Sequence, residues 1–70
     1  MRNKKVVELT PYEQAVKEFH TAAAAYRHAE ANFHNAFPEY FDIANQELTA
    51  ARTRVDSAMQ RVRILRQEVR

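Results

Sequence analysis

Glycine and cysteine are both absent from this 70-residue chain, and proline occurs only at Pro11 and Pro38. Without glycine the backbone has few positions that reach positive φ at low energy, so a fold built from short strands and tight hairpins is disfavoured. Without cysteine the chain forms no disulfide and no thiolate metal site, which fits a reducing compartment. These absences leave a single small all-α domain as the expected fold class.

Long apolar runs are absent as well. No stretch approaches the roughly 20 apolar residues that a membrane-spanning helix requires. The first seven residues are positively charged but are not followed by the apolar core of a signal peptide. We therefore expect a cytoplasmic protein that does not bind membranes.

The chain is organised around residues 35–41, which form the clearest break between two long helical patterns. Asn35 suits a left-handed helix cap, and Pro38 disfavours helical geometry in the residue before it. The sequence predicts a flexible basic arm over residues 1–9, a helix over about 11–35, a turn at about 35–38 and a helix over about 39–69.

The start of the first helix carries a strong local signal. Thr10 is placed to cap the helix, and Pro11 occupies the first helical position, where no N–H is needed. Glu13 lies three residues after Thr10 and completes the pattern of a capping box.

Apolar residues recur at helical spacing on both sides of the break. In the first helix an aromatic residue returns every seven positions, at Tyr12, Phe19, Tyr26 and Phe33. The alternate core positions of this helix are Val16, Ala23, Glu30 and Phe37, and the stripe is widened by Ala15, Ala22 and Ala29. In the second helix the seam is Phe41, Ala44, Leu48, Ala51, Val55, Ala58, Val62, Leu65 and Val69. A seven-residue repeat indicates a left-handed, coiled-coil-like supercoil.

A hairpin that turns near Pro38 brings the two seams together as an antiparallel pair. The expected facing pairs, to within a turn, are Phe33 with Ala44, Tyr26 with Ala51 and Phe19 with Ala58. Rings then meet methyl groups, so the layers interlock and the backbones approach closely. The predicted architecture is therefore a two-helix antiparallel hairpin.

Glu30 interrupts the apolar seam and allows two interpretations. In one, it is a rim residue whose carboxylate reaches water. In the other, it is a buried polar residue that fixes the register by pairing with Arg52 or Arg54. Glu30 and His34 also lie four residues apart on one helix face, but two ligands fall short of the three or four that a metal site needs. We expect no catalytic, cofactor-binding or metal-binding residues, and no enzymatic activity.

The middle of the chain combines Ala29-Glu30-Ala31-Asn32-Phe33, a Pro38-Glu39 turn, and Glu47-Leu48-Thr49-Ala50-Ala51 with Arg52 or Arg54 after it. Over roughly residues 26–55 this combination resembles the YaaL-like family of short uncharacterised bacterial proteins. The shared features are an aromatic residue near the end of the first helix, a Pro-acidic turn, and an Ala-rich second helix followed by a basic residue. The resemblance implies a helical hairpin without enzymatic activity, and it brings no established biochemical function.

Charge is unevenly distributed, although the net charge is only +2. Residues 1–10 and 51–70 are basic and residues 11–50 are acidic, so a hairpin has a positive open end and a negative turn end. The second helix contains Arg52, Arg54, Arg61, Arg63, Arg66 and Arg70. These arginines divide between the two flanks of the seam, whereas a phosphate-binding stripe prefers one exposed face. A nucleic-acid-binding accessory protein, using this Arg-rich end and the basic arm, is therefore the alternative prediction.

The preferred prediction is a non-enzymatic protein–protein interaction or structural module. Two helices bury only one stripe each, so a hairpin this small gains little stability from its own core. The candidate interaction residues are Tyr40, Ile43, Ile64, Arg63 and Arg66. We expect a homodimer that forms a four-helix bundle, with the positive end of one hairpin over the negative end of the other. Binding of an unidentified protein is the alternative use of the same residues.

Overall fold

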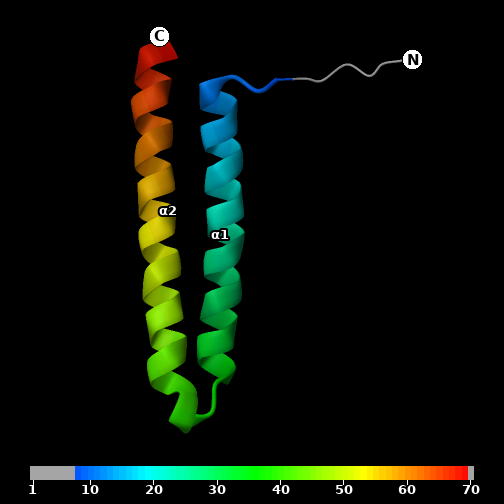
Figure 1. Cartoon of the computed structure of the whole chain (residues 1–70), viewed down its shortest axis with the longest axis vertical. Helices are drawn as coiled ribbons and strands as arrows, with labels where there is room; N and C mark the ends of the chain where they lie inside the picture. The colour runs from blue at the N-terminus through cyan, green and yellow to red at the C-terminus, as the bar shows by residue number, and fades with distance from the viewer. Residues whose placement is uncertain (1–7, 70) are drawn as a thin grey trace, which may run out of the picture.

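The computed structural model of the protein describes residues 8–69, and the side chains of residues 8–67. Helix α1 spans Pro11–Asn35, the short 3-10 helix η1 spans Pro38–Tyr40, and helix α2 spans Phe41–Val69. The two long helices lie side by side and antiparallel, with the turn at one end of the molecule (Figure 1). This confirms the predicted all-α hairpin of two packed helices. Most of the predicted basic arm, residues 1–7, lies outside the described part of the chain.

Helix α1 begins with the capping box that the sequence predicts. The Glu13 backbone N–H donates to Thr10 Oγ1 at 3.1 Å, and the Thr10 backbone N–H donates to Glu13 Oε1 at 3.0 Å. Pro11 occupies the first turn, where its missing N–H costs nothing. Two backbone donors that the helix itself leaves without partners are thereby satisfied.

Replacing Thr10 with alanine should therefore destabilise the hairpin by about 1 kcal/mol, within the usual range for loss of a helix cap. Thr53→Ala is the matched control, because Thr53 lies within α2 and its hydroxyl only donates to the Thr49 backbone oxygen at 3.1 Å. Urea unfolding monitored by circular dichroism compares the two variants. Equal stability of Thr10→Ala and wild type would show that the capping box is not formed in solution.

The turn between the helices is built from extended residues. Ala36 has φ −75° and ψ 143°, and Phe37 has φ −68° and ψ 152°. The predicted left-handed cap at Asn35 is wrong. Asn35 is the last residue of α1, and no described residue has positive φ. The physical reason is Pro38, which moves the preceding residue into extended geometry and so ends the helix without a left-handed residue.

Helix α2 begins slightly later than predicted. The sequence predicts helical residues from about position 39, whereas residues Pro38–Tyr40 form a 3-10 turn and the α-helix starts at Phe41. The Tyr40 backbone N–H donates to the Phe37 oxygen at 2.8 Å. This tighter turn is common at helix ends, and it leads the chain from the extended residues into α2.

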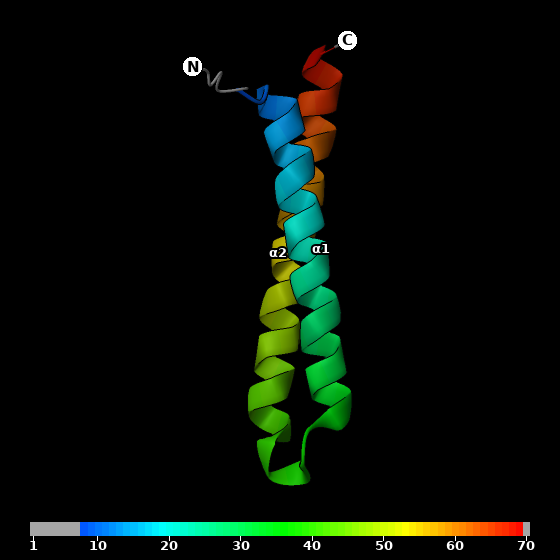
Figure 2. The ribbon, with the colours of Figure 1, turned by 90° about the vertical axis from the view of Figure 1, so that its right-hand side faces the viewer.

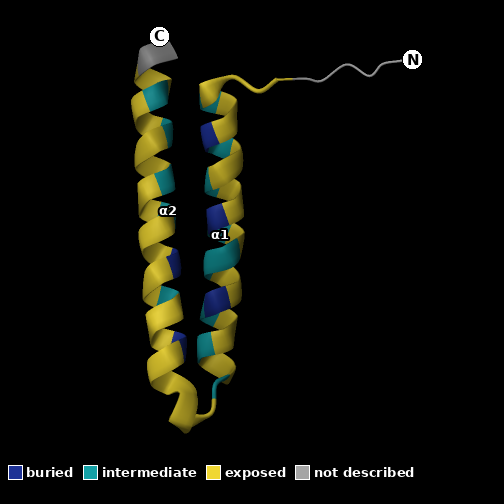
Figure 3. Cartoon of the chain, viewed as in Figure 1, coloured by how far each residue is buried: buried dark blue, intermediate teal, exposed yellow. Residues whose placement is uncertain are grey.

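Alanine forms the buried centre of the helix pair (Figure 3). The buried residues among the described side chains are Ala15, Ala22, Ala29, Ala44 and Ala51. The three alanines of α1 were predicted to lie at the edge of the apolar stripe, and this prediction is wrong. Ala15 is only 1% exposed and Ala22 only 4% exposed. Val16 and Ala23, assigned to the core, are half-buried instead. Small side chains occupy the line of closest approach, so the two backbones can pack closely.

Two contacts fix the alignment of the helices. Near the open end, Arg61 Nη1 donates to Glu18 Oε1 at 2.8 Å. Near the turn, the Phe33 and Phe41 rings stack with centroids 5.3 Å apart and an interplanar angle of 22°. The first contact places Phe19, the residue after Glu18, within one turn of the level of Ala58. The level of the two helices therefore agrees with the predicted register to within a turn, but the Phe33 ring stacks on the Phe41 ring and not on the predicted methyl group of Ala44.

The hairpin is a single layer. Its smallest dimension is 12 Å, which is about the diameter of one helix with its side chains. In the view turned by 90° the helices overlap and cross at a shallow angle (Figure 2). No other element of residues 8–69 covers either broad side of the pair. Both sides are therefore available for contact with another molecule.

Candidate interaction surface

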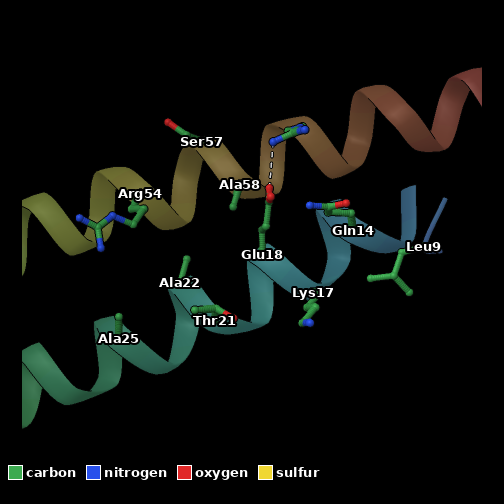
Figure 4. Close-up of a pocket in the computed structure, with 11 residues that line it drawn as sticks. Leu9, Gln14, Lys17, Glu18, Thr21, Ala22, Ala25, Arg54, Ser57 and Ala58 are labelled. Atoms are coloured by element: carbon green, nitrogen blue, oxygen red, sulfur yellow. Dashed lines mark hydrogen bonds and ion pairs between the residues drawn. The ribbon is translucent and has the colours of Figure 1, made fainter. Parts of the chain in front are cut away.

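A groove of about 610 Å³ runs along one side of the helix pair. One half of it is lined by Thr21, Ala22 and Ala25 of α1 and by Arg54, Ser57 and Ala58 of α2, and the other half by Leu9, Gln14, Lys17, Glu18 and Arg61. Figure 4 shows the side chains of Ala22 and Ala58 pointing toward one another between the helices. The groove exists because small side chains line both helices at this level, and no larger residue fills the space above them.

The ion pair between Glu18 and Arg61 crosses the middle of this groove, with Gln14 and Leu9 on one side of it and Ala22 and Ala58 on the other (dashed line in Figure 4). Both side chains are about half exposed, so solvent screens the attraction and we expect a contribution of at most about 1 kcal/mol. The ion pair matters more for the position of the Arg61 side chain than for stability. It leaves part of the Arg61 guanidinium at the groove, together with the exposed Arg54.

A row of exposed residues extends from the groove along α2. The row recurs every seven residues and consists of Ile43, Ala50, Ser57 and Ile64, of which Ser57 lines the groove. Because a seven-residue spacing keeps residues on one side of a supercoiled helix, Ile43 and Ile64 share the side of Ser57. Ile43 is 57% exposed and Ile64 is 53% exposed. We call this row the Ile43–Ile64 row.

The predicted interaction residues do not all lie together. Ile43 and Ile64 belong to the row just defined, and Tyr40 is exposed at the turn. Arg63 and Arg66 are also exposed, but helical spacing places them on the other side of α2. The candidate surface is therefore the groove with the Ile43–Ile64 row, without the two arginines.

Glu30 does not act as a buried device that fixes the register. It is half-buried, and no polar or charged residue is buried among the described side chains. Because the alanines of α1 occupy the centre of the seam, Glu30 lies one position to the side of it, where its carboxylate reaches water. The rim interpretation therefore fits the structure, and the interhelical ion pair is Glu18 with Arg61 instead.

The turn exposes an aromatic residue that the sequence analysis assigned to the seam. Phe37 is 70% exposed, and it lies near the exposed Tyr40 and Phe41. The signal that could have identified it is its place before Pro38, since an extended residue leaves the helical period. The contact between Glu18 and Arg61 could not be predicted from the sequence, because it depends on the register of the two helices.

Within residues 8–69, no three histidine, cysteine, aspartate or glutamate side chains come together where they could bind a metal ion. None of the described helices has the combination of length and apolar character needed to cross a membrane.

Comparisons with protein-family models, with curated proteins and with solved structures gave no match to this chain. The resemblance to the YaaL-like family therefore stays a prediction from the residues quoted above.

Proposed function

We propose that this protein is a non-enzymatic helical association module of the cytoplasm, whose working form is a homodimer arranged as a four-helix bundle. The observation that supports this most directly is the composition of the core: every buried residue among the described side chains is alanine. Larger apolar residues such as Ile43, Ile64 and Phe37 remain more than half exposed.

Energetics favour association over an isolated hairpin. Burial of apolar area stabilises by about 25 cal/mol per Å², and an alanine side chain contributes little area. Chains shorter than roughly 70–80 residues rarely gain more than about 3–5 kcal/mol from one core, so small domains often rely on oligomerisation. A second hairpin placed on the groove would bury apolar area that one hairpin leaves in water.

The rival function is nucleic-acid binding through the Arg-rich end of α2. Arg61 is already paired with Glu18, and Arg63 and Arg66 lie on a different side of α2 from Arg54. A phosphate backbone is best bound by a continuous basic surface, because each neutralised phosphate releases counterions. The distribution of the arginines therefore favours association with protein.

Sedimentation equilibrium at several micromolar concentrations tests the proposal. We expect the mass to rise toward twice the 8.2 kDa of one chain, and the melting temperature to rise with protein concentration. A monomeric mass with a concentration-independent melting temperature would contradict the homodimer. Salt-sensitive gel shifts of DNA or RNA at low ionic strength would favour the rival function instead.

A further inference from the structure

We infer that the groove and the Ile43–Ile64 row receive a second copy of this chain in antiparallel orientation, so that Ile43 of each copy packs against Ile64 of the other. This inference rests on the proposed self-association and adds the face and the register. Four observations on the described residues support it: the sizes along the row, the charges beside it, the charge of the whole hairpin, and the character of its opposite side.

The Ile43–Ile64 row is symmetric in size. It has an isoleucine at each end and the small residues Ala50 and Ser57 between them. A two-fold axis near the middle of α2, between Thr53 and Arg54, places Ile43 opposite Ile64 of the second copy and Ala50 opposite Ser57. An isologous interface requires this self-complementary pattern, in which residue i contacts residue j and residue j contacts residue i.

The charges beside the row are complementary under the same axis. Glu47 and Arg61 each lie seven residues from Arg54, on opposite sides of it. The axis therefore brings Glu47 of one copy next to Arg61 of the other, twice in the dimer. Arg61 can also bind this second carboxylate. Its guanidinium has five N–H donors, and the structure shows one of them donating to Glu18.

The charge of the whole hairpin favours the same orientation. No lysine or arginine occurs from residue 28 to residue 51, and the turn end carries Glu30, Glu39, Asp42 and Glu47. The open end carries Lys17, Arg61, Arg63 and Arg66 against Glu8, Glu13 and Glu18, so its described residues have a small excess of positive charge. An antiparallel pair places each acidic turn over a basic open end, whereas a parallel pair brings like charges together.

The opposite side of the helix pair is a poorer docking surface. There α2 presents Asp42, Arg52, Asp56, Arg63 and Arg66, and the same axis would pair Asp42 with Arg66 and Asp56 with Arg52, so charge does not separate the two sides. Apolar exposure does: Met59, 37% exposed, is the large apolar residue of α2 on this side, whereas the groove side has Ile43 and Ile64, which are 57% and 53% exposed. On α1, the groove side offers the small residues Thr21 and Ala25.

One feature of this arrangement opposes association. The two copies of Arg54 approach each other beside the two-fold axis, where like charges repel. Both guanidiniums are exposed in the single chain, but Arg54 lines the groove, so the second copy would cover them without supplying an opposite charge at the axis. Arg54→Gln should therefore leave dimerisation unchanged or strengthen it, and a marked loss of dimer would contradict the inferred axis.

Cysteine cross-linking tests face and register together, because the chain has no cysteine of its own. Ile43→Cys and Ile64→Cys are prepared as separate single variants, mixed at micromolar concentration and mildly oxidised. Within one helix the two positions are about 31 Å apart, far beyond the reach of a disulfide. We expect cross-linked dimer from the mixture, identified by mass as one copy of each variant, and little from either variant alone.

Asp42→Cys and Arg63→Cys form the matched control pair. Each lies one residue before its counterpart, at the same level of α2 but on the opposite side of the hairpin. Cross-linking of this pair instead would overturn the inferred face while leaving self-association intact. Efficient cross-linking of Ile43→Cys with itself would show a parallel arrangement and overturn the register.

Two further outcomes separate the inference from the proposed function. If wild-type protein sediments as a dimer but no pair cross-links, self-association stands and the inferred interface is wrong. If wild-type protein sediments as a monomer, both the homodimer and this interface are wrong. Circular dichroism of each cysteine variant verifies that it retains the helical content of wild type before oxidation.

Discussion

Replacing Ala22 with leucine should destabilise the protein by about 1–3 kcal/mol, the range observed when extra methylene groups are forced into a packed core. Ala22 is 4% exposed and lies where α1 and α2 approach each other. Ala22 also lines the groove, so only the part of a leucine side chain that turns into the groove finds space, and the rest forces the helices apart or a strained rotamer. For a domain of this size each kcal/mol lowers the melting temperature by about 4–8 °C.

Ala24→Leu is the matched control, because Ala24 is an exposed residue of the same helix only two positions away. Alanine and leucine have similar helix propensities, so the control should change stability by less than about 0.5 kcal/mol. Thermal melting of both variants at one protein concentration gives the comparison. Equal melting temperatures for Ala22→Leu and Ala24→Leu would mean that the alanine seam is not tightly packed in solution.

Replacing Phe33 with alanine should destabilise the protein by about 2–3 kcal/mol, somewhat below the range for a fully buried phenylalanine because Phe33 is half-buried. The substitution removes a ring that stacks on Phe41 with centroids 5.3 Å apart, a contact that connects the end of α1 to the start of α2. Stacked aromatic pairs contribute about 0.5–1.5 kcal/mol beyond the area they bury.

Phe37→Ala provides the comparison for Phe33→Ala, since it deletes the same ring four residues later. Phe37 is 70% exposed, so its loss should change stability little at low protein concentration. Chemical denaturation of both variants measures the difference. A Phe37→Ala variant as unstable as Phe33→Ala would mean that the Phe37 ring is buried in the working form, either in the hairpin or in its assembly.

Local signals in the sequence are strong enough to predict most of the fold. Thr10, Pro11 and Glu13 specify the start of α1 through contacts between near neighbours, and Pro38 specifies the break through its effect on Phe37. Such features depend on a few adjacent residues, so they can be predicted without the tertiary structure. The antiparallel arrangement then follows from the short connection between two amphipathic helices.

The depth of burial within the seam was harder to predict. A hydrophobic pattern favours Val16 and Phe37 over Ala15 and Ala22, because larger side chains gain more from burial. The structure reverses this order, since the residues at the line of closest approach are chosen for small volume. Glu30 was predicted to lie in the seam for the same reason. It follows Val16 and Ala23 at seven-residue spacing, and that row was assigned to the core in place of the row of alanines.

The candidate surface was predicted in part. Ile43 and Ile64 are recognisable in the sequence because they are large apolar residues outside the seam, and both are exposed. The groove beside them depends on the register between α1 and α2, which brings Thr21 and Ala25 level with Arg54 and Ser57. The spacing of residues within one helix does not indicate which residues of the other helix lie beside them, so the groove could not be predicted from the sequence.

The alanine seam also makes the length of this protein modular. The same residue type recurs every seven positions in both helices, at Ala15, Ala22 and Ala29 of α1 and at Ala44 and Ala51 of α2. Inserting or deleting seven residues in both helices at the same level changes the rod by about 10.5 Å and keeps every remaining layer in place. A seven-residue change in one helix alone preserves its buried face but leaves one end without a partner. Variation in the length of such a hairpin is therefore compatible with its packing only when both helices change together.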